Sequence, residues 1–399
     1  MKQTVEDIDV RRRRVLVRAD FNVPLRDGQV ADDSRIRAAL PTIQYLLAHE
    51  ASVIVCSHLG RPNGRVVKAL SLRPVAERLS ALLGVRVDLA SSVVGRKVET
   101  RVAALQPGQV LLLENVRFHR NEETNGKLFA ERLAKLADVY VNDAFGTAHR
   151  AHASTEGVAR LLPSVAGLLM AKELDALGGV LEGAGRKAVV SGGAKVRDKL
   201  GLLRHVVDHA DVLCVGGAMA NTFLLAQGVE VGKSLVEREM VEEARAILSA
   251  AKGKCEVVLP VDCVIAEGPD QPPRARPLLF EEESVPQDWA ILDIGPKTVG
   301  LFMEALKRAD VVIWNGPLGL FERGAFSGGT RELARKLAEL EARTIVCGGE
   351  TVQAVREAGV ADAITHLSTG GGAALELLEG RTLPGVAVLA DARAGAKAQ

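Results

Sequence analysis

The chain has 399 residues, 47% of them hydrophobic, which exceeds the size of a single core and supplies enough apolar side chains for two domains. No run approaches the 18 apolar residues of a membrane span, the polar N-terminus is unlike a secretory signal, and five scattered cysteines without a C-x-x-C pair favour a reducing cytoplasm over disulfides or zinc. The net charge of +1 is unevenly distributed: residues 1–168 contain 25 basic and 18 acidic residues, and the rest of the chain contains 26 basic and 32 acidic residues. The basic first half therefore suits an anionic ligand. The chain has no basic stripe interleaved with aromatic residues, which would indicate nucleic-acid binding.

Short β-branched runs alternate with segments of helical period, which predicts βαβ units and a parallel sheet in each half. In the first half the expected strands are 15–19, 52–56, 85–89, 110–113 and 139–142. An amphipathic helix is expected over 35–49, begun by Asp33 and Ser34. The basic run Arg11–Arg14 directly precedes a strand and is interpreted as a solvated strand entrance.

The two halves are expected to join near 165–185, where Leu168–Leu181 has the pattern of an amphipathic helix. In the second half the expected strands are 187–191, 211–215, 256–261, 290–293, 311–314, 344–347 and 363–366. The Pro-rich segment 266–277 predicts an exposed loop, and a helix is expected over 330–340. The pattern predicts two doubly wound parallel-sheet domains, whose ligands bind beyond the carboxyl ends of the strands.

Charged and polar side chains follow the strands of the first half. They are Asp20, Asn22, Arg35, His58, Arg61, Arg117 and Arg150. Guanidinium groups hold carboxylates or phosphates through paired hydrogen bonds, and Asp20 and Asn22 could accept hydroxyl protons of the same ligand. A single strand-end arginine is usually a surface charge, and His149 and His152 could be packing or capping residues. Five cationic groups at the same ends of successive strands instead predict one site for a small anion.

Glycines follow the strands of the second half. Gly192 and Gly193 precede Lys195 and Lys199, which are expected on one face of a helix, and free N–H groups with two ammonium groups suit a polyphosphate. The pattern is neither a Walker loop nor a dinucleotide fingerprint. Three consecutive glycines, 370–372, precede the expected helix Ala373–Leu378 and could direct several N–H groups at one anion.

A second glycine pair, Gly348 and Gly349, is followed by Glu350 and Thr351. From spacing alone Glu350 is equally well a helix N-terminal charge or a Mg²⁺ ligand. The segment Asn315-Gly316-Pro317, followed by Glu322, could line the base and ribose of a nucleotide.

Together these segments resemble the phosphoglycerate kinase family. The segments that carry the resemblance are 18–24, 57–62, 114–119, 143–150, 192–199, 293–298, 314–322 and 368–372. They occur in family order between residue 15 and about 386, so the resemblance covers essentially the whole chain.

The resemblance implies a cytoplasmic, monomeric kinase of glycolysis that exchanges a phosphoryl group between ATP and the carboxylate of 3-phosphoglycerate with Mg²⁺. It implies a phosphoglycerate-binding domain over 1–168, a nucleotide-binding domain over 169–380, and a segment 381–399 that returns to the first domain. A hinge helix would join the two domains, and closure would exclude water.

By matching positions, the resemblance also implies which residues hold each ligand. Phosphoglycerate would be held by Asp20, Phe21, Asn22, Arg35, His58, Leu59, Gly60, Arg61, Arg117 and Arg150. The nucleotide would be held by Gly193, Ala194, Lys195, Lys199, Leu292, Asn315, Glu322, Gly348, Gly349, Glu350 and Thr351, with Glu350 on the metal. The groups expected to stabilise the moving phosphoryl charge are Arg35, Lys195 and the N–H groups of Gly370, Gly371 and Gly372.

The chain departs from the family pattern at two positions and in one loop. Glu350 stands where the family usually has the aspartate that ligates the metal, and Cys347 stands where it has a third glycine. Glutamate keeps the carboxylate, so the change concerns the geometry of the metal and not the reaction. Segment 266–277 is longer than family members usually show.

Two other classes remain alternatives at this point. A nicotinamide dehydrogenase would share the two-domain α/β fold but needs a dinucleotide fingerprint, which the chain lacks. A non-enzymatic binding protein with a closing cleft would leave two unlike ligand sites without a purpose. The acceptor carboxylate of a kinase reaction is already ionised at neutral pH and needs no general base, in agreement with the absence of an obvious base in the glycine loops.

Overall fold

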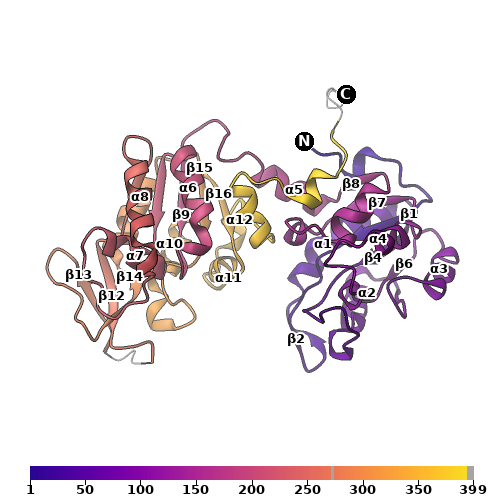
Figure 1. Ribbon diagram of the computed structural model, residues 1–399, viewed down its shortest axis with the longest axis horizontal. Coiled ribbons are helices and arrows are strands. Elements are labelled where there is room, and N and C mark those ends of the chain that lie inside the picture. Colours follow the sequence, from indigo (N-terminus) through magenta and orange to yellow (C-terminus); the bar gives the residue numbers. More distant parts are fainter. Residues whose placement is uncertain (271–273, 393–399) are drawn as a thin grey trace. The chain divides into compact units, whose positions relative to one another are not determined.

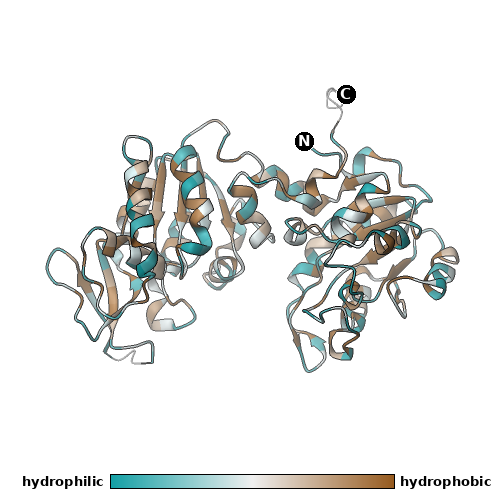
Figure 2. Cartoon of the chain, viewed as in Figure 1, coloured by the Kyte–Doolittle hydropathy of each residue, from teal (hydrophilic) through white to brown (hydrophobic). Residues whose placement is uncertain are grey.

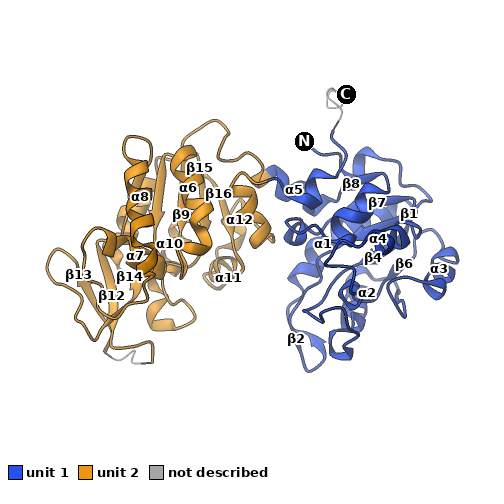
Figure 3. Cartoon of the chain, viewed as in Figure 1, with its two compact units in different colours: residues 1–175, 382–399 blue, residues 176–381 orange. Residues whose placement is uncertain are grey.

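The computed structural model describes residues 1–270 and 274–392 and divides them into two compact units (Figure 3). The first unit is Met1–Asp175 with the chain from Thr382 onward, and the second is Ala176–Arg381. The boundary falls inside helix α5 (Leu168–Leu177), seven residues after the division expected from the sequence. This helix is shorter than the expected Leu168–Leu181.

The first unit is built on a six-stranded parallel sheet of order β5-β6-β4-β1-β7-β8 (Figure 1). The strands are β1 (Arg14–Arg18), β4 (Ser52–Cys56), β5 (Val87–Leu89), β6 (Val110–Leu112), β7 (Val139–Asn142) and β8 (Ser164–Ala166). All are short, and all except β5, in which only Val87 is buried, are mostly buried, as in a sheet covered on both faces. The chain leaves β1 toward β4 on one side, and β7 pairs with β1 on the other, so the strand order reverses between β1 and β7. In open α/β sheets the ligand binds beyond the strand ends at such a point.

Helices and a hairpin complete this unit. They are α1 (Ser34–Ala48), α2 (Arg73–Leu83), α3 (Arg96–Ala103), α4 (Lys127–Ala134), α13 (Pro384–Ala387) and the two-stranded β2 (Leu25–Arg26) and β3 (Gln29–Val30). The described part of the C-terminal segment is tied to the rest of the unit: the N–H of Gly385 donates to the carbonyl of Ala148 at 2.8 Å, and Lys2 pairs with Asp391 at 2.8 Å. The remainder of the expected segment 381–399, residues 393–399, lies outside the described residues.

The second unit has a parallel sheet of order β11-β10-β9-β15-β16-β17 (Figure 1). The strands are β9 (Lys187–Ser191), β10 (Val212–Val215), β11 (Glu256–Val258), β15 (Val311–Asn315), β16 (Arg343–Cys347) and β17 (His366–Leu367). The helices are α6 (Leu200–His209), α7 (Gly217–Ala226), α8 (Val241–Ala251), α9 (Pro296–Leu306), α10 (Gly328–Leu337), α11 (Gly349–Glu357) and α12 (Gly372–Leu378). Its order of parallel strands is the 3-2-1-4-5-6 of nucleotide-binding sheets, and the order reverses between β9 and β15.

Several expectations for this unit are wrong. The segment 290–293, expected in the parallel sheet, forms β14 (Ala290–Ile294) in a separate antiparallel sheet with β12 (Asp262–Ala266) and β13 (Arg276–Leu279). The expected strand 256–261 ends at Val258, and Pro260, which lacks a backbone N–H, separates it from β12. The two ends of the expected Pro-rich loop 266–277 therefore belong to strands β12 and β13. Residues 271–273 of this loop lie outside the described residues.

Both parallel sheets are packed into apolar cores. Figure 2 shows their strands in the brown of hydrophobic residues, while the helices carry teal over part of their surface. The first unit buries Phe21, Phe129, Phe145 and Tyr140 among aliphatic side chains, and the second core contains Trp314 and Phe302, both fully buried. All five cysteines are buried, as expected for small apolar side chains. Among the described residues, no helix is long and apolar enough to cross a membrane.

Helix α9 offers a matched pair of leucines that tests the second core. Leu306 is fully buried and Leu301 is 38% exposed. We expect Leu306→Ala to lower the free energy of unfolding of the second unit by about 2–5 kcal/mol, because it leaves a cavity, and Leu301→Ala to change it by about 0.5 kcal/mol or less. Both tryptophans, Trp289 and Trp314, lie in this unit, so urea unfolding followed by tryptophan fluorescence reports on it alone. Equal effects of the two substitutions would contradict this packing.

Candidate functional site

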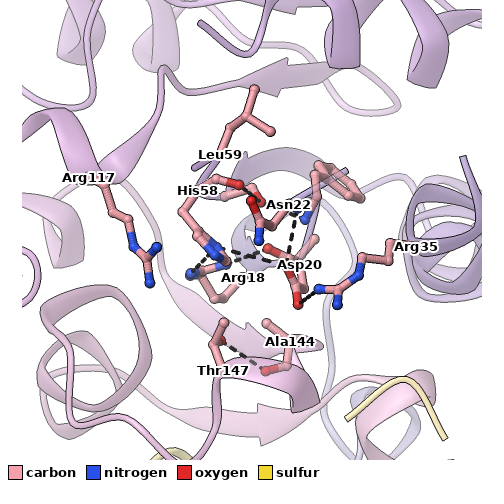
Figure 4. Close-up of polar contacts among 12 residues, drawn as sticks. Arg18, Asp20, Asn22, Arg35, His58, Leu59, Arg117, Ala144 and Thr147 are labelled. Carbon is pink, nitrogen blue, oxygen red and sulfur yellow. Dashed lines mark hydrogen bonds and ion pairs between the residues drawn. The ribbon is translucent and has the colours of Figure 1, made fainter. Parts of the chain in front are cut away.

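The polar residues of the first unit lie beyond the carboxyl ends of β1, β4 and β7, at the reversal in strand order (Figure 4). Two hydrogen bonds join the loops after β1 and β4. The N–H of Phe21 donates to Ser57 Oγ at 2.8 Å, and the N–H of Gly60 donates to Asn22 Oδ1 at 2.9 Å. The two loops therefore form one rigid surface.

Asp20 lies at the centre of this surface. One carboxylate oxygen pairs with Arg35 Nη1, and the other accepts the N–H of Asn22 at 3.1 Å. Arg35 comes from the first turn of α1 and is 39% exposed, so it keeps donors that Asp20 does not occupy. Asp20 thus orients Arg35 toward the site.

Arg18, which sequence reasoning did not select, is the most buried cation here. It is 1% exposed at the end of β1. Its Nε donates to Ser154 Oγ at 2.8 Å, its Nη1 to the carbonyl of Ala19, and its Nη2 lies 3.3 Å from His58 Nδ1 (Figure 4). The one signal in the sequence was an arginine directly after the apolar run Val15–Val17.

His58 is buried and surrounded by cations. Burial lowers its pKa well below the usual value, and Arg18, Arg117, Arg150 and Arg35 lower it further. The imidazole is therefore neutral at pH 7, and the positive potential that keeps it neutral also attracts an anion.

The remaining predicted arginines differ in how firmly they are held. Arg117 is buried: its Nη1 donates to the carbonyl of Gly60 at 2.8 Å, and its Nε pairs with Glu123 at 3.2 Å. Arg150 is half-buried and donates from Nε to His149 Nε2 at 3.1 Å. Arg61 is exposed on its turn and is not among the cations that lower the pKa of His58. The structure thus brings Arg35, Arg117 and Arg150 to one place and leaves Arg61 at the surface.

In the second unit, glycines fill the reversal between β9 and β15. A Cβ atom on Gly217 would lie 2.5 Å from the backbone N of Gly193, and one on Gly316 would lie 2.4 Å from the carbonyl O of Gly192. Gly193, Gly217 and Gly316 have φ of +101°, +65° and +97°. Only glycine permits the close approach at Gly217 and Gly316 and the positive φ at all three positions. Gly316 was predicted only as part of the segment Asn315-Gly316-Pro317, and Gly217 was not among the residues expected to hold the nucleotide.

The expectation that Lys195 and Lys199 share one helical face is wrong. Residues Arg197–Lys199 form a 3-10 turn, α6 begins only at Leu200, and Lys195 precedes both. Lys195 is exposed, whereas Lys199 Nζ donates to the carbonyls of Gly192 at 2.5 Å and Asn315 at 2.8 Å. Burial lowers the pKa of Lys199 to about 7, and the carboxylate of Glu350 is the largest opposing influence.

The other predicted nucleotide residues lie at or after the carboxyl ends of β9, β15 and β16, except Leu292, which lies in β14 of the separate antiparallel sheet. Thr351, in the first turn of α11, is buried and accepts the N–H of Gly316 at 2.7 Å. Glu350 and Gly349 are exposed at the start of the helix and Gly348 is half-buried. Of the remaining predicted residues, Asn315 is buried, and Leu292 and Gly193 are half-buried. Ala194 and Glu322 are exposed. In the described ranges 1–270 and 274–392, no three His, Cys, Asp or Glu residues cluster as a metal site.

The three consecutive glycines supply fewer free donors than expected. Gly370 is buried and its N–H donates to Ser368 Oγ at 3.1 Å. Gly371, with φ of +52°, and Gly372, the first residue of α12, are more exposed. The N–H groups of Gly371 and Gly372 are therefore the better candidates for an anion.

The chain matches the family model described as phosphoglycerate kinase over residues 5–381. A relative named phosphoglycerate kinase from Pelotomaculum thermopropionicum is 54% identical over 392 residues, covering 98% of this chain and 99% of the relative. One from Chloroflexus aggregans is 52% identical over 399 residues, with the same coverage. Among solved structures, phosphoglycerate kinase from Coxiella burnetii is similar with a TM-score of 0.87 at 40% identity, covering 97% of this chain and 98% of that one. Phosphoglycerate kinase from Pyrococcus horikoshii OT3 gives 0.84 at 33%, with 98% of both chains covered.

The neutral His58 predicts a pH dependence of stability. Its folded pKa lies below the roughly 6.5 of an unfolded chain, so below pH 6.5 the unfolded chain binds a proton that the folded chain does not, and stability is lost as the pH falls. One such group contributes up to about 1.4 kcal/mol per pH unit. We expect His58→Gln to lose about 1 kcal/mol less than the unsubstituted protein between pH 6.5 and 5.5. Urea unfolding followed by circular dichroism measures this, and identical losses would show that folding does not lower the pKa of His58.

Proposed function

The chain belongs to the phosphoglycerate kinase family and is a kinase, and we propose that it catalyses 1,3-bisphosphoglycerate + ADP = 3-phosphoglycerate + ATP with a carboxylate as the phosphoryl acceptor. The observation that carries the proposal is the cationic surface of the first unit, where four arginines surround a neutral histidine at the reversal in strand order. A small polyanion is the ligand that such a surface favours.

On the phosphoglycerate side, each predicted residue has a role that its position supports. Arg117 and Arg150 would hold the phosphate, His58 would donate from its protonated ring nitrogen, and Arg35 would lie at the transferring group. Asp20 and Asn22 would accept a hydrogen bond from the substrate hydroxyl. Phe21 contributes the backbone between these two residues, and Leu59 and Gly60 contribute the backbone of the loop after β4. Arg61, exposed in the ligand-free chain, would join on binding.

On the nucleotide side, the site follows from backbone and one lysine. The glycines after β9 and β15 let a phosphate approach the main chain, and Lys199 would donate to it once the phosphate competes with the carbonyls of Gly192 and Asn315. Lys195, which is exposed, would reach the transferring phosphoryl group. Leu292, Asn315 and Glu322 would line the base and ribose.

Glu350 fits a Mg²⁺ ion that takes most of its ligands from phosphates and water. Mg²⁺ commonly binds through one or two carboxylates together with nucleotide phosphates. Glu350 is exposed at the start of α11 and close enough to Lys199 to raise its pKa. When bound, the ion would neutralise phosphate charge at this edge of the sheet.

Catalysis would then consist of positioning and charge stabilisation, because the attacking carboxylate is already ionised. Arg35, Lys195 and the N–H groups of Gly370 to Gly372 would stabilise the moving charge, with Gly371 and Gly372 the freer donors. We further propose that the enzyme works as a cytoplasmic monomer in glycolysis, in keeping with its five buried thiols.

The direct test is a spectrophotometric assay coupled to reduction of 1,3-bisphosphoglycerate. ATP, Mg²⁺ and 3-phosphoglycerate together should give turnover, and omission of any one should abolish it. ADP release from ATP with another phosphorylated acid, measured by an assay coupled to ADP, but none with 3-phosphoglycerate, would overturn the substrate assignment.

Lys195 and the exposed Lys252 of the same unit form a matched pair of substitutions. We expect Lys195→Ala to lower kcat by about 100-fold to 1000-fold, because it removes a donor to the transferring group, while the Kd of 3-phosphoglycerate is unchanged. Lys252→Ala should leave both constants at the unsubstituted values. A Lys195→Ala enzyme with normal kcat would remove this lysine from the role.

Since the proposed ligand sets belong to different units, transfer requires the units to bring them together and exclude water. We expect the radius of gyration from small-angle scattering to fall when 3-phosphoglycerate and a non-hydrolysable ATP analogue are both present, and to change little with either alone. An unchanged radius with both ligands would argue against hinge closure.

A further inference from the structure

A fully buried carboxylate, which the proposed mechanism does not use, lies behind the cationic surface of the first unit. Glu122 is 0% exposed. Its Oε1 accepts the hydroxyl of Ser154 at 2.6 Å and its Oε2 accepts the backbone N–H of the same serine at 3.0 Å. Both oxygens accept, as in the ionised form, although burial raises the pKa of Glu122 against the opposing influence of Arg18.

The hydrogen bonds from Arg18 to Glu122 run in one direction. Arg18 Nε lies 2.8 Å from Ser154 Oγ, and a guanidinium can only donate. Ser154 Oγ therefore accepts from Arg18 and sends its own proton to Glu122. The orientation of the guanidinium is thus fixed from behind by a buried anion.

The other side of the same guanidinium sets the proton of His58. Arg18 Nη2 lies 3.3 Å from His58 Nδ1, so this ring nitrogen must accept. Asp20 Oδ1, which could otherwise accept a proton from Nδ1, is 3.8 Å away and too far for a hydrogen bond. The neutral ring therefore carries its proton on Nε2.

We propose that Glu122 is a positioning residue for phosphoglycerate binding: through Ser154 it holds Arg18, and Arg18 holds His58 with the proton on Nε2, ready to donate to the substrate anion. The last step of this inference rests on the proposed function. The assignment of the tautomer does not, because it follows from the donors and acceptors of the ligand-free chain.

A simple charge effect predicts the opposite result. Glu122 is an anion near a site for anions, so through Coulomb repulsion alone its neutralisation would tighten phosphoglycerate binding. A positioning role predicts weaker binding, because the arginine loses its fixed orientation and the histidine its single tautomer. The direction of the change in Kd therefore separates the two.

The chain offers a matched control for the serine. Ser154 and Ser164 are both buried in the first unit, and Ser164 Oγ donates only to the carbonyls of Ala159 and Leu162 within the described contacts. Each of the substitutions Ser154→Ala and Ser164→Ala removes one serine hydroxyl. Only Ser154→Ala interrupts the hydrogen bonds from Arg18 to Glu122. Glu122→Gln keeps the shape of the side chain and removes its charge.

The experiment combines two measurements on the full chain. Long-range ¹H–¹⁵N spectra of the ligand-free protein identify the His58 tautomer, with His58→Gln to assign its signals among the eight histidines. Titration with 3-phosphoglycerate gives Kd, and the KM for ATP serves as an internal reference.

We expect a single Nε2–H tautomer in the unsubstituted protein and in Ser164→Ala, and mixed tautomers in Ser154→Ala and Glu122→Gln. The latter two should bind 3-phosphoglycerate about tenfold more weakly, with the KM for ATP changed by about twofold or less. A retained Nε2–H tautomer with normal Kd in Ser154→Ala, or tighter binding in Glu122→Gln, would overturn the proposal. If the unsubstituted protein shows the Nε2–H tautomer but does not bind 3-phosphoglycerate, the proposed function fails and the tautomer assignment stands.

Discussion

A guanidinium buried at the end of a parallel strand is the constraint on which the first site depends. Arg18 ends β1, is 1% exposed, and cannot lose its charge inside the protein. A buried charge is tolerated only when its donors are paired, and the neighbouring loops supply that pairing through Ser154, the carbonyl of Ala19 and His58. The loops that would hold an anion are thereby fixed around a cation before any anion arrives.

The second unit achieves preorganisation with backbone in place of charge. Gly217 and Gly316 let strand ends meet so closely that a methyl group would collide with main-chain atoms, and Gly193 supplies a positive φ beside them. Thr351 accepts the N–H of Gly316 and fixes α11 against this junction. The N–H groups of Gly193, Gly217 and Gly316 all donate within this junction, so Lys199 is the group there that suits a phosphate.

Much of this could be predicted from the sequence because it depends on local pattern. Strand ends followed by Asp20, His58 or Gly192 are readable, and the family resemblance that they carry is confirmed over nearly the whole chain, as are two parallel-sheet domains. Arg18 and Glu122 were not predicted because their interaction runs through Ser154 and joins residues that are far apart in sequence. The error at Lys195 had a local cause, since propensity does not show that a 3-10 turn delays the start of α6 to Leu200.

In each unit, a carboxylate that has no direct contact with the buried cation affects the orientation or the pKa of that cation. Ser154 separates Glu122 from Arg18, and Glu350 raises the pKa of Lys199 while two carbonyls accept its protons. The two cations differ in one respect that matters for function. Arg18 remains charged whatever its surroundings and can therefore serve as a permanent support, whereas burial brings the pKa of Lys199 to about 7, so its charge responds to whatever anion lies beside it. The residue types thus allow a support for orientation at Arg18 and, under the proposed function, a donor to phosphate at Lys199 whose charge responds to its surroundings.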